Sequence, residues 1–221
     1  MRKIYFYPHL YLRDRQLETI KTWPISEVVN PEIAFNRVGN QVDKKTAISK
    51  KMKFSWKQKI PLLNIKSRPK NLNQDTILYI WGGVTIKGLF ITELDNPWSL
   101  VGYNIKAMIL YSFVIRRILK SDRCLQIRCM SQACRESLRL LFGKEIYDKS
   151  HLSYPKVNIT KFNQDKKTNK TTKFLFIGTQ FELKGGEPLI RAFCNAYKKN
   201  SNISLSIITH LPNNFSNNYE G

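Results

Sequence analysis

Residues 173–193, KFLFIGTQFELKGGEPLIRAF, join a β-like run to a helix-like run across one glycine-rich break. The apolar run Phe174–Ile177 stops at Gly178, and apolar residues with helical spacing begin after Lys184–Gly186. A second β-like run, Ile203–Ile208, follows the expected helix. A strand, a helix and a strand in this order predict two parallel strands joined by a right-handed crossover, so we expect an α/β fold.

The break between Gly178 and Gly186 is the first candidate site. In open parallel sheets, ligands bind where the carboxyl end of a strand leads into a helix. Gly185 and Gly186 carry no side chain that would block a ligand from backbone N–H groups, and Lys184 adds a cation beside them. The pattern matches neither GxxxxGK[ST] nor GxGxxG. It favours a phosphate or diphosphate site, and a plain glycine turn is the alternative.

Upstream, β-like runs alternate with helix-like runs. We expect strands in residues 4–7, 61–66, 75–83, 88–97 and 124–130. We expect one helix over Asn104–Leu119 and another from Ser131, a typical N-cap, to Gly143, a typical helix terminator. Alternating strands and helices indicate a Rossmann-like domain with a parallel sheet.

A polar segment rich in Lys and Asn separates this domain from the strand–helix–strand unit. We therefore expect a Rossmann-like first domain in residues 1–155, a linker in residues 156–172, and the first β-α-β unit of a second Rossmann-like domain in residues 173–221.

The chain is strongly basic. Its 221 residues include 37 Lys and Arg against 16 Asp and Glu, a formal net charge of +21, which favours an anionic partner. The first 70 residues hold sixteen Lys/Arg and five Asp/Glu, and residues 44–59 hold seven lysines and no acid. A solvated basic surface is the simplest interpretation of residues 44–59, and an anion-binding face is the alternative.

We expect a cytoplasmic protein. Arg13, Asp14 and Arg15 stand where the apolar region of a secretory signal would continue. The most apolar run, Ala107–Ile115, is shorter than the roughly 20 residues that a membrane-spanning helix needs.

The four cysteines, Cys124, Cys129, Cys134 and Cys194, are interpreted as buried thiols. Cys129 falls on an expected strand and Cys134 on an expected helix, and no nearby second pair completes a set of four metal ligands. The three histidines are scattered, and none is assigned a catalytic role.

The stretch FLFIGTQFELKGGEPLIRAF resembles the start of the C-terminal donor-binding domain in glycosyltransferase family 4, also called glycosyl transferases group 1. The matching residues are Gly178, Lys184, Gly185, Ala192 and Phe193. The segments ELDNPW, RCMSQACRESLRLLFG and SYPKV resemble the late N-terminal domain of the same family. The resemblance covers roughly residues 61–221 and implies a GT-B fold, in which the N-terminal Rossmann-like domain binds the acceptor.

The resemblance also implies site residues. Lys184 would bind the diphosphate of a nucleotide-sugar, together with the loop residues Gly178, Thr179, Gly185 and Gly186. Thr179 stands where the family often has a second basic residue.

On the acceptor side, Asp95 would be the catalytic residue that contacts the transferred sugar. It stands near the position of a common family histidine, and a simple Asp95–Pro97 turn is the alternative. Gly82 and Gly83 would line the cleft.

The function implied is transfer of a sugar from a nucleotide-sugar to a glycan or lipid-linked acceptor in polysaccharide synthesis, with retention of configuration. No metal or other cofactor is expected, because a fixed lysine and backbone donors can stabilise the leaving diphosphate. The basic N-terminal region would favour peripheral contact with an anionic membrane at its inner face.

The family's pair of glutamates seven residues apart does not follow Lys184, and the chain ends after the second strand of the expected donor domain. We therefore expect this chain alone to be inactive. The alternatives are a basic nucleic-acid-binding protein, although no RRM, KH, helix-turn-helix or zinc signature is present, and a non-catalytic GT-B remnant that acts as an interaction module.

Overall fold

A computed structural model describes residues 2–7, 12–34, 62–157, 171–178 and 180–209. The chain divides into two compact units, Met1–Lys161 and Phe162–Gly221, and each unit is described by itself. Residues 44–59, where the basic surface was expected, and residues 158–170, most of the expected linker, lie outside the described residues.

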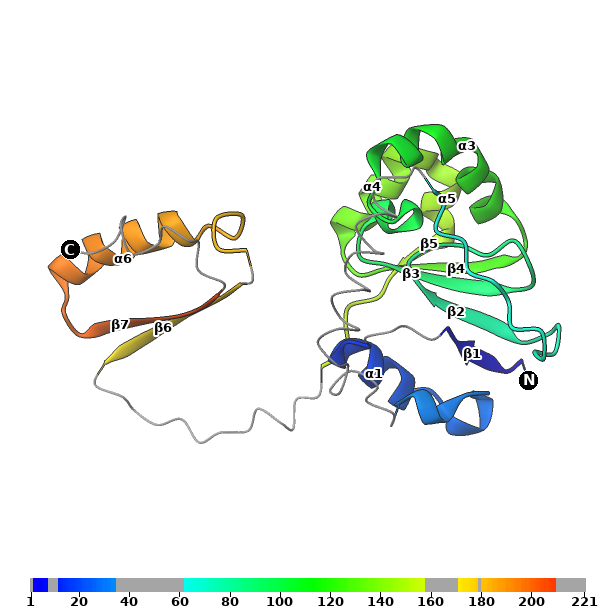
Figure 1. Cartoon of the computed structure of the whole chain (residues 1–221), viewed down its shortest axis with the longest axis horizontal. Helices are drawn as coiled ribbons and strands as arrows, with labels where there is room; N and C mark the ends of the chain where they lie inside the picture. Colours follow the sequence, from blue (N-terminus) through cyan, green and yellow to red (C-terminus); the bar gives the residue numbers. More distant parts are fainter. Residues whose placement is uncertain (1, 8–11, 35–61, 158–170, 179, 210–221) are drawn as a thin grey trace, which may run out of the picture. The chain divides into compact units, whose positions relative to one another are not determined.

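The first unit is an α/β structure built on a parallel sheet of five strands, whose spatial order follows their order in the chain (Figure 1). The strands are β1 Ile4–Phe6, β2 Ile77–Trp81, β3 Phe90–Leu94, β4 Cys124–Cys129 and β5 Ser150–Leu152. Every neighbouring pair is parallel, so all five carboxyl ends lie at one edge of the sheet. This architecture is compatible with a Rossmann-like fold.

Helices cover both faces of this sheet (Figure 1). The α-helices are α1 Asp14–Lys21, α3 Ile105–Lys120, α4 Gln132–Phe142 and α5 Lys144–Lys149, and the 3₁₀ helices are η1 Ile25–Glu27, η2 Pro31–Ala34 and η3 Pro97–Val101. Helices α3, α4 and α5 lie over one face, and α1 lies over the other.

Alternation along the central strands explains this layering. In β2, Leu78 and Ile80 pack in the core beneath α3, whereas Tyr79 packs in the smaller core beneath α1. All five residues of β3 are buried, as expected for a strand that has neighbours on both sides and helices on both faces.

Local caps fix the ends of the helices, and those at Ser131 and Gly143 were predicted from the sequence. The Asn104 Oδ1 atom accepts a hydrogen bond of 3.0 Å from Ala107 N at the start of α3. The Ser131 Oγ atom accepts one of 3.1 Å from Cys134 N at the start of α4. Gly143, with φ +90°, follows the last residue of α4, so the predicted stop is confirmed.

The expected strand over residues 61–66 is wrong. Within its described part, Ile65 makes only an isolated bridge to Val84. Ile65 thus pairs with the connection from β2 to β3, at Val84, instead of with a strand of the sheet. Asn64 N–H and Lys66 N–H likewise donate to carbonyl oxygens outside the sheet, those of Leu100 in η3 and of Val84.

The Asn30 side chain forms hydrogen bonds with the outer edge of β1, as the backbone of a neighbouring strand would. Asn30 accepts a hydrogen bond from Phe6 N at 3.0 Å and donates one to Phe6 O at 2.8 Å. Val29 N–H also donates to Ile4 O at 2.8 Å. Together these bonds satisfy the exposed backbone groups of an edge strand.

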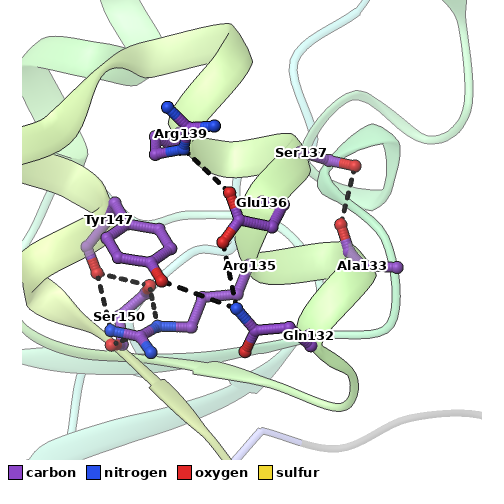
Figure 2. Close-up of polar contacts among 8 residues, drawn as sticks. All are labelled: Gln132, Ala133, Arg135, Glu136, Ser137, Arg139, Tyr147 and Ser150. Carbon is purple, nitrogen blue, oxygen red and sulfur yellow. Dashed lines mark hydrogen bonds and ion pairs between the residues drawn. The ribbon is translucent and has the colours of Figure 1, made fainter.

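A polar network joins α4, α5 and β5 (Figure 2). The Arg135 guanidinium lies over the Tyr147 ring, 4.2 Å from its centroid, and donates to Ser150 O at 3.1 Å. Ser150 is completely buried, and its hydroxyl donates to Tyr147 O at 2.6 Å. Glu136 forms an exposed ion pair with Arg139 at 2.8 Å. The network fixes the last described strand of the sheet to its covering helices.

The second unit is the predicted β-α-β motif. Its elements are β6 Thr172–Gly178, α6 Gly186–Lys199 and β7 Ile203–Thr209. The two strands are parallel over their full length, from Thr172 opposite Ile203 to Gly178 opposite Thr209. Phe174 of β6 meets Phe193 of α6 edge-on, so this face of the strand pair is covered by the helix. Leu175, Ile177 and Ile208 are exposed.

We predict that Asn30→Ala destabilises the first unit by about 2 to 4 kcal/mol, because two buried backbone groups of Phe6 lose their partners. Urea unfolding followed by tryptophan fluorescence measures this change, since all four tryptophans lie in the first unit. The matched control is Asn71→Ala at an exposed turn, which should change stability by less than about 0.5 kcal/mol. Equal effects of the two substitutions would contradict the edge-covering role.

Candidate functional site

Several charged side chains lie together at the carboxyl edge of the first unit's sheet. Glu93 is the second-last residue of β3, and Asp95 follows the end of that strand. Arg128 comes from the neighbouring β4, directly opposite Glu93, and Arg15 comes from the first turn of α1. This edge is where parallel α/β sheets bind their ligands.

Asp95 is exposed and is held by a tyrosine. The Tyr103 hydroxyl lies 2.9 and 3.0 Å from the two carboxylate oxygens of Asp95. The next residue, Asn96, caps η3 by accepting a hydrogen bond of 2.9 Å from Trp98 N. The structure therefore contains the Asp95–Pro97 turn, and this turn leaves the Asp95 carboxylate exposed at the carboxyl end of β3.

Tyr103 has an unusual backbone conformation. Its φ of +64° is left-handed, and no other non-glycine residue in the described ranges has a positive φ. This conformation is unfavourable for a residue with a Cβ atom, and such residues are enriched at functional sites. Burial, followed by the Asp95 charge, raises the pKa of Tyr103 to about 12, so its hydroxyl remains a hydrogen-bond donor at neutral pH.

Glu93 belongs to a buried group on the α1 face of the sheet. The Tyr79 hydroxyl donates a short hydrogen bond to Glu93 Oε2. Arg128 lies over the Tyr79 ring, 5.6 Å from its centroid, and donates to Ser153 Oγ from Nε at 3.1 Å. Neighbouring strands thus supply an acid, a phenol and a guanidinium that are in contact.

Burial raises the pKa of Glu93 above its ordinary value, and the nearby charge of Asp95 adds to this effect. The Tyr79 hydrogen bond and the positive charges of Arg128 and Arg15 oppose the shift. A buried carboxyl with a raised pKa can hold a proton at a higher pH than an exposed one, which is the property of a general acid.

Three buried donor nitrogens lack an acceptor in the part of the chain that the structure describes: Arg15 Nε, Trp23 Nε1 and Trp81 Nε1. Trp23 and Trp81 both pack against Phe6, edge-on at 5.9 Å and stacked at 6.0 Å between ring centroids. A buried donor without an acceptor is destabilising, so these three nitrogens mark positions where the described residues leave hydrogen bonds unmade.

Gly82 and Gly83 are glycines for local packing reasons. Both are buried, with φ of +70° and +91°. A Cβ atom at Gly83 would overlap the Asn64 carbonyl, and one at Gly82 would lie 3.2 Å from Ser99 Cβ. These contacts account for both glycines without a ligand, and their role in lining a cleft stays a prediction.

In the second unit, Gly178, Lys184, Gly185 and Gly186 lie at the end of β6 and the start of α6. The stem of Lys184 packs over Gly178, since a Cβ atom there would be 3.2 Å from Lys184 Cγ. Gly185 has φ +77°, and a Cβ atom at Gly186 would overlap the Phe181 ring. The two adjacent glycines therefore allow a tight turn that places an exposed lysine at the strand's carboxyl end.

The backbone donors of this turn are already used inside the loop. The N–H groups of residues 184–186 donate to the carbonyl oxygens of Gln180, Glu182 and Phe181 at 3.0, 3.0 and 2.9 Å. An anion would thus meet the Lys184 ammonium first, rather than a preformed set of N–H groups. Thr179 lies outside the described residues.

Three of the four cysteines are buried, as the sequence predicted, and burial raises the pKa of Cys124 to about 12. The expectation for Cys194 is wrong, because it lies on an exposed side of α6. Within the described ranges, no three His, Cys, Asp or Glu side chains come together to form a metal site.

Comparison with known proteins gives no family: no family model matches the chain, and no curated protein matches it at a significant level. Among the helices that the structure describes, none is long and apolar enough to cross a membrane.

Sequence reasoning named Asp95 as a candidate and did not name the residues around it. Glu93 carried a signal, because it is the only acid inside the apolar run from Leu89 to Leu94. Tyr79, Arg128 and Tyr103 carried none, since their meeting depends on strand register and on one unusual backbone angle.

We predict a pH-dependent contribution of Glu93 to stability. Between its ordinary pKa of 4.5 and its raised pKa in the folded protein, only the folded state holds the proton on Glu93. This contribution is therefore complete below pH 4.5 and is lost as the pH rises through the raised pKa. The free energy of unfolding of wild type, relative to Glu93→Gln, should fall across that window in urea titrations followed by tryptophan fluorescence.

Glu136→Gln is the matched control. Its hydrogen bond to Arg139 lowers the pKa of Glu136, so any contribution of Glu136 is present above pH 4.5 and is lost as the pH falls. The two variants should thus show pH trends of opposite sign. A wild-type advantage over Glu93→Gln that grows with pH would contradict the buried, proton-holding state of Glu93.

Proposed function

We propose that the protein is a glycosyltransferase, or part of one, that transfers a sugar from a nucleotide-sugar to a glycan or lipid-linked acceptor in polysaccharide synthesis. The observation that carries this proposal is the position of Lys184. Its side chain is packed over Gly178 at the carboxyl end of β6, immediately before α6, in a parallel β-α-β unit.

This arrangement suits the diphosphate of a nucleotide-sugar. Lys184 is an exposed cation, and the start of α6 adds the positive end of a helix dipole. Sugar transfer leaves negative charge on the nucleoside diphosphate, and a fixed cation beside a helix start stabilises that charge as it develops. The chemistry needs no metal, and at Gly185 even a Cβ atom would meet nothing within 4 Å, so the backbone there is open to a phosphate beside the lysine.

The acceptor side of the proposal falls on the carboxyl edge of the first unit. Asp95 offers two oxygens that can accept hydrogen bonds from a sugar hydroxyl, and Tyr103 holds that carboxylate in place. Arg15 and Trp81 add donor nitrogens that have no acceptor among the described residues. A carbohydrate, which carries both donors and acceptors on every hydroxyl, fits such a mixed set of groups.

In this proposal the two units are the Rossmann-like domains of a GT-B enzyme, with the acceptor on the first and the donor on the second. The five-stranded parallel sheet and the β-α-β unit support that assignment as far as fold class. A lipid-linked acceptor would bring the protein to the inner face of the membrane, where its net charge of +21 favours anionic lipid.

Lys184→Ala tests the donor site. We expect the affinity of the chain for UDP, GDP, ADP or inorganic pyrophosphate, measured by isothermal titration calorimetry, to fall about 10- to 100-fold, as for the loss of a hydrogen bond to a charged group. The diphosphates that bind wild type would also indicate the class of nucleotide.

Two controls accompany this variant. Lys198→Ala removes an exposed cation from the last turn of the same helix, and Asp95→Asn changes the first unit only. Neither should weaken diphosphate binding more than about twofold. An affinity that is unchanged in Lys184→Ala, or that falls equally in Lys198→Ala, would reject Lys184 as the diphosphate ligand.

A further inference from the structure

Helix α3 is apolar on two opposite sides. Its inner side packs against the sheet through residues such as Met108 and Ile115, which are buried. Its outer side exposes large apolar residues as well: Ile109 and Phe113 are each 75% exposed, and Leu110 is 62% exposed. A helix on the surface of a domain normally turns a polar side outward, so a contiguous apolar surface of this kind marks a site of interaction.

The remaining exposed residues of α3 are all cationic. The helix has nine exposed positions, of which five are apolar and four are basic, namely Lys106, Arg116, Arg117 and Lys120. No acid occurs in the helix, and within the part of the chain that the structure describes only Lys120 among these cations forms a salt bridge, at 2.6 Å to Glu145. The exposed apolar residues lie between Ile105 and Val114, and three of the four cations follow them in the last turn and a half of the helix.

We propose that this outer face of α3 docks on an anionic lipid membrane, with the helix lying in the plane of the surface. Apolar side chains such as Phe113 would enter the boundary between headgroups and acyl chains, and Arg116 and Arg117 would contact lipid phosphates. The helix is too short to span a bilayer and can only lie along it.

Charge complementarity selects this occupant over a second copy of the chain. A symmetric dimer through α3 would bring two sets of four cations together, without an acid in either helix to pair with them. An anionic membrane supplies both partners that the face lacks, a negatively charged surface and an apolar layer beneath it. Docking through α3 does not depend on sugar transfer.

One consequence does rest on the proposed function. Helix α3 begins two residues after Tyr103, the tyrosine that holds Asp95. A docked α3 would therefore keep the carboxyl edge of the sheet close to the lipid headgroups, where a lipid-linked acceptor presents its sugar or phosphate.

The test is co-sedimentation of the full chain with vesicles of phosphatidylcholine and phosphatidylserine in a 70:30 ratio, beside vesicles of phosphatidylcholine alone. Wild type should bind only the anionic vesicles, and high salt should weaken its binding. Ile109→Gln with Phe113→Gln should weaken binding about 10- to 100-fold, and Arg116→Gln with Arg117→Gln about 30-fold. All four side chains are exposed, so neither pair of substitutions disturbs the core.

Matched controls lie in the second unit. Leu183 is 80% exposed, and Lys198 and Lys199 end α6. Leu183→Gln, and Lys198→Gln with Lys199→Gln, should leave vesicle binding within about twofold of wild type. A loss as large in these controls as in the α3 variants would mean that binding depends on charge and apolar content in general, and would overturn the proposal.

A labelled variant tests insertion directly. In a Cys194→Ser background, Phe113→Cys places an accessible thiol on α3 while the three other cysteines stay buried. An environment-sensitive fluorophore at residue 113 should shift to shorter wavelength with anionic vesicles only. No shift would overturn docking through this face. Dimerisation in sedimentation velocity that Ile109→Gln with Phe113→Gln abolishes, without vesicle binding by wild type, would instead assign the face to a second copy.

Discussion

The parallel pairing of β3 with β2 on one side and β4 on the other is the constraint on which the first unit depends. Because the three strands run in one direction, the side chains near their carboxyl ends are brought together, although Tyr79, Glu93 and Arg128 are far apart in the chain. The pairing also leaves both faces of β3 to be covered, by α3 and α4 on one side and by α1 on the other. The parallel pairing of β2, β3 and β4 therefore determines both the core and the candidate site.

The position of Glu93 inside this sheet makes its charged form unfavourable. A carboxylate inside a sheet loses its hydration, and the structure offsets this loss with the Tyr79 hydroxyl and with the charges of Arg128 and Arg15. The offset is incomplete, because the pKa of Glu93 remains raised. A buried acid with a raised pKa, beside donors that lack acceptors among the described residues, is a feature of functional sites more than of a core built for stability.

Local signals in the sequence predicted what is locally determined. The cap at Ser131, the stop at Gly143 and the β-α-β unit all depend on neighbours nearby in the sequence. The expected strand over residues 61–66 failed because pairing partners, rather than β-like composition, decide whether a segment joins a sheet. Asp95 was visible at a strand end, whereas the left-handed Tyr103 that holds it was not, since a tyrosine gives no sequence signal of such an angle.

For helix α3 as well, the sequence alone could not predict which apolar residues are buried and which are exposed. The run Ala107–Ile115 is too short to span a membrane, and its apolar content suits a buried helix equally well. Only the packed structure separates residues that face the sheet, such as Met108 and Ile115, from residues that face outward, such as Ile109 and Phe113. The inner set alone would suffice to hold α3 on the sheet. The outer set contributes nothing to that packing and is unfavourable in water, so an environment that is both apolar and anionic is what its mixture of large apolar and cationic side chains fits.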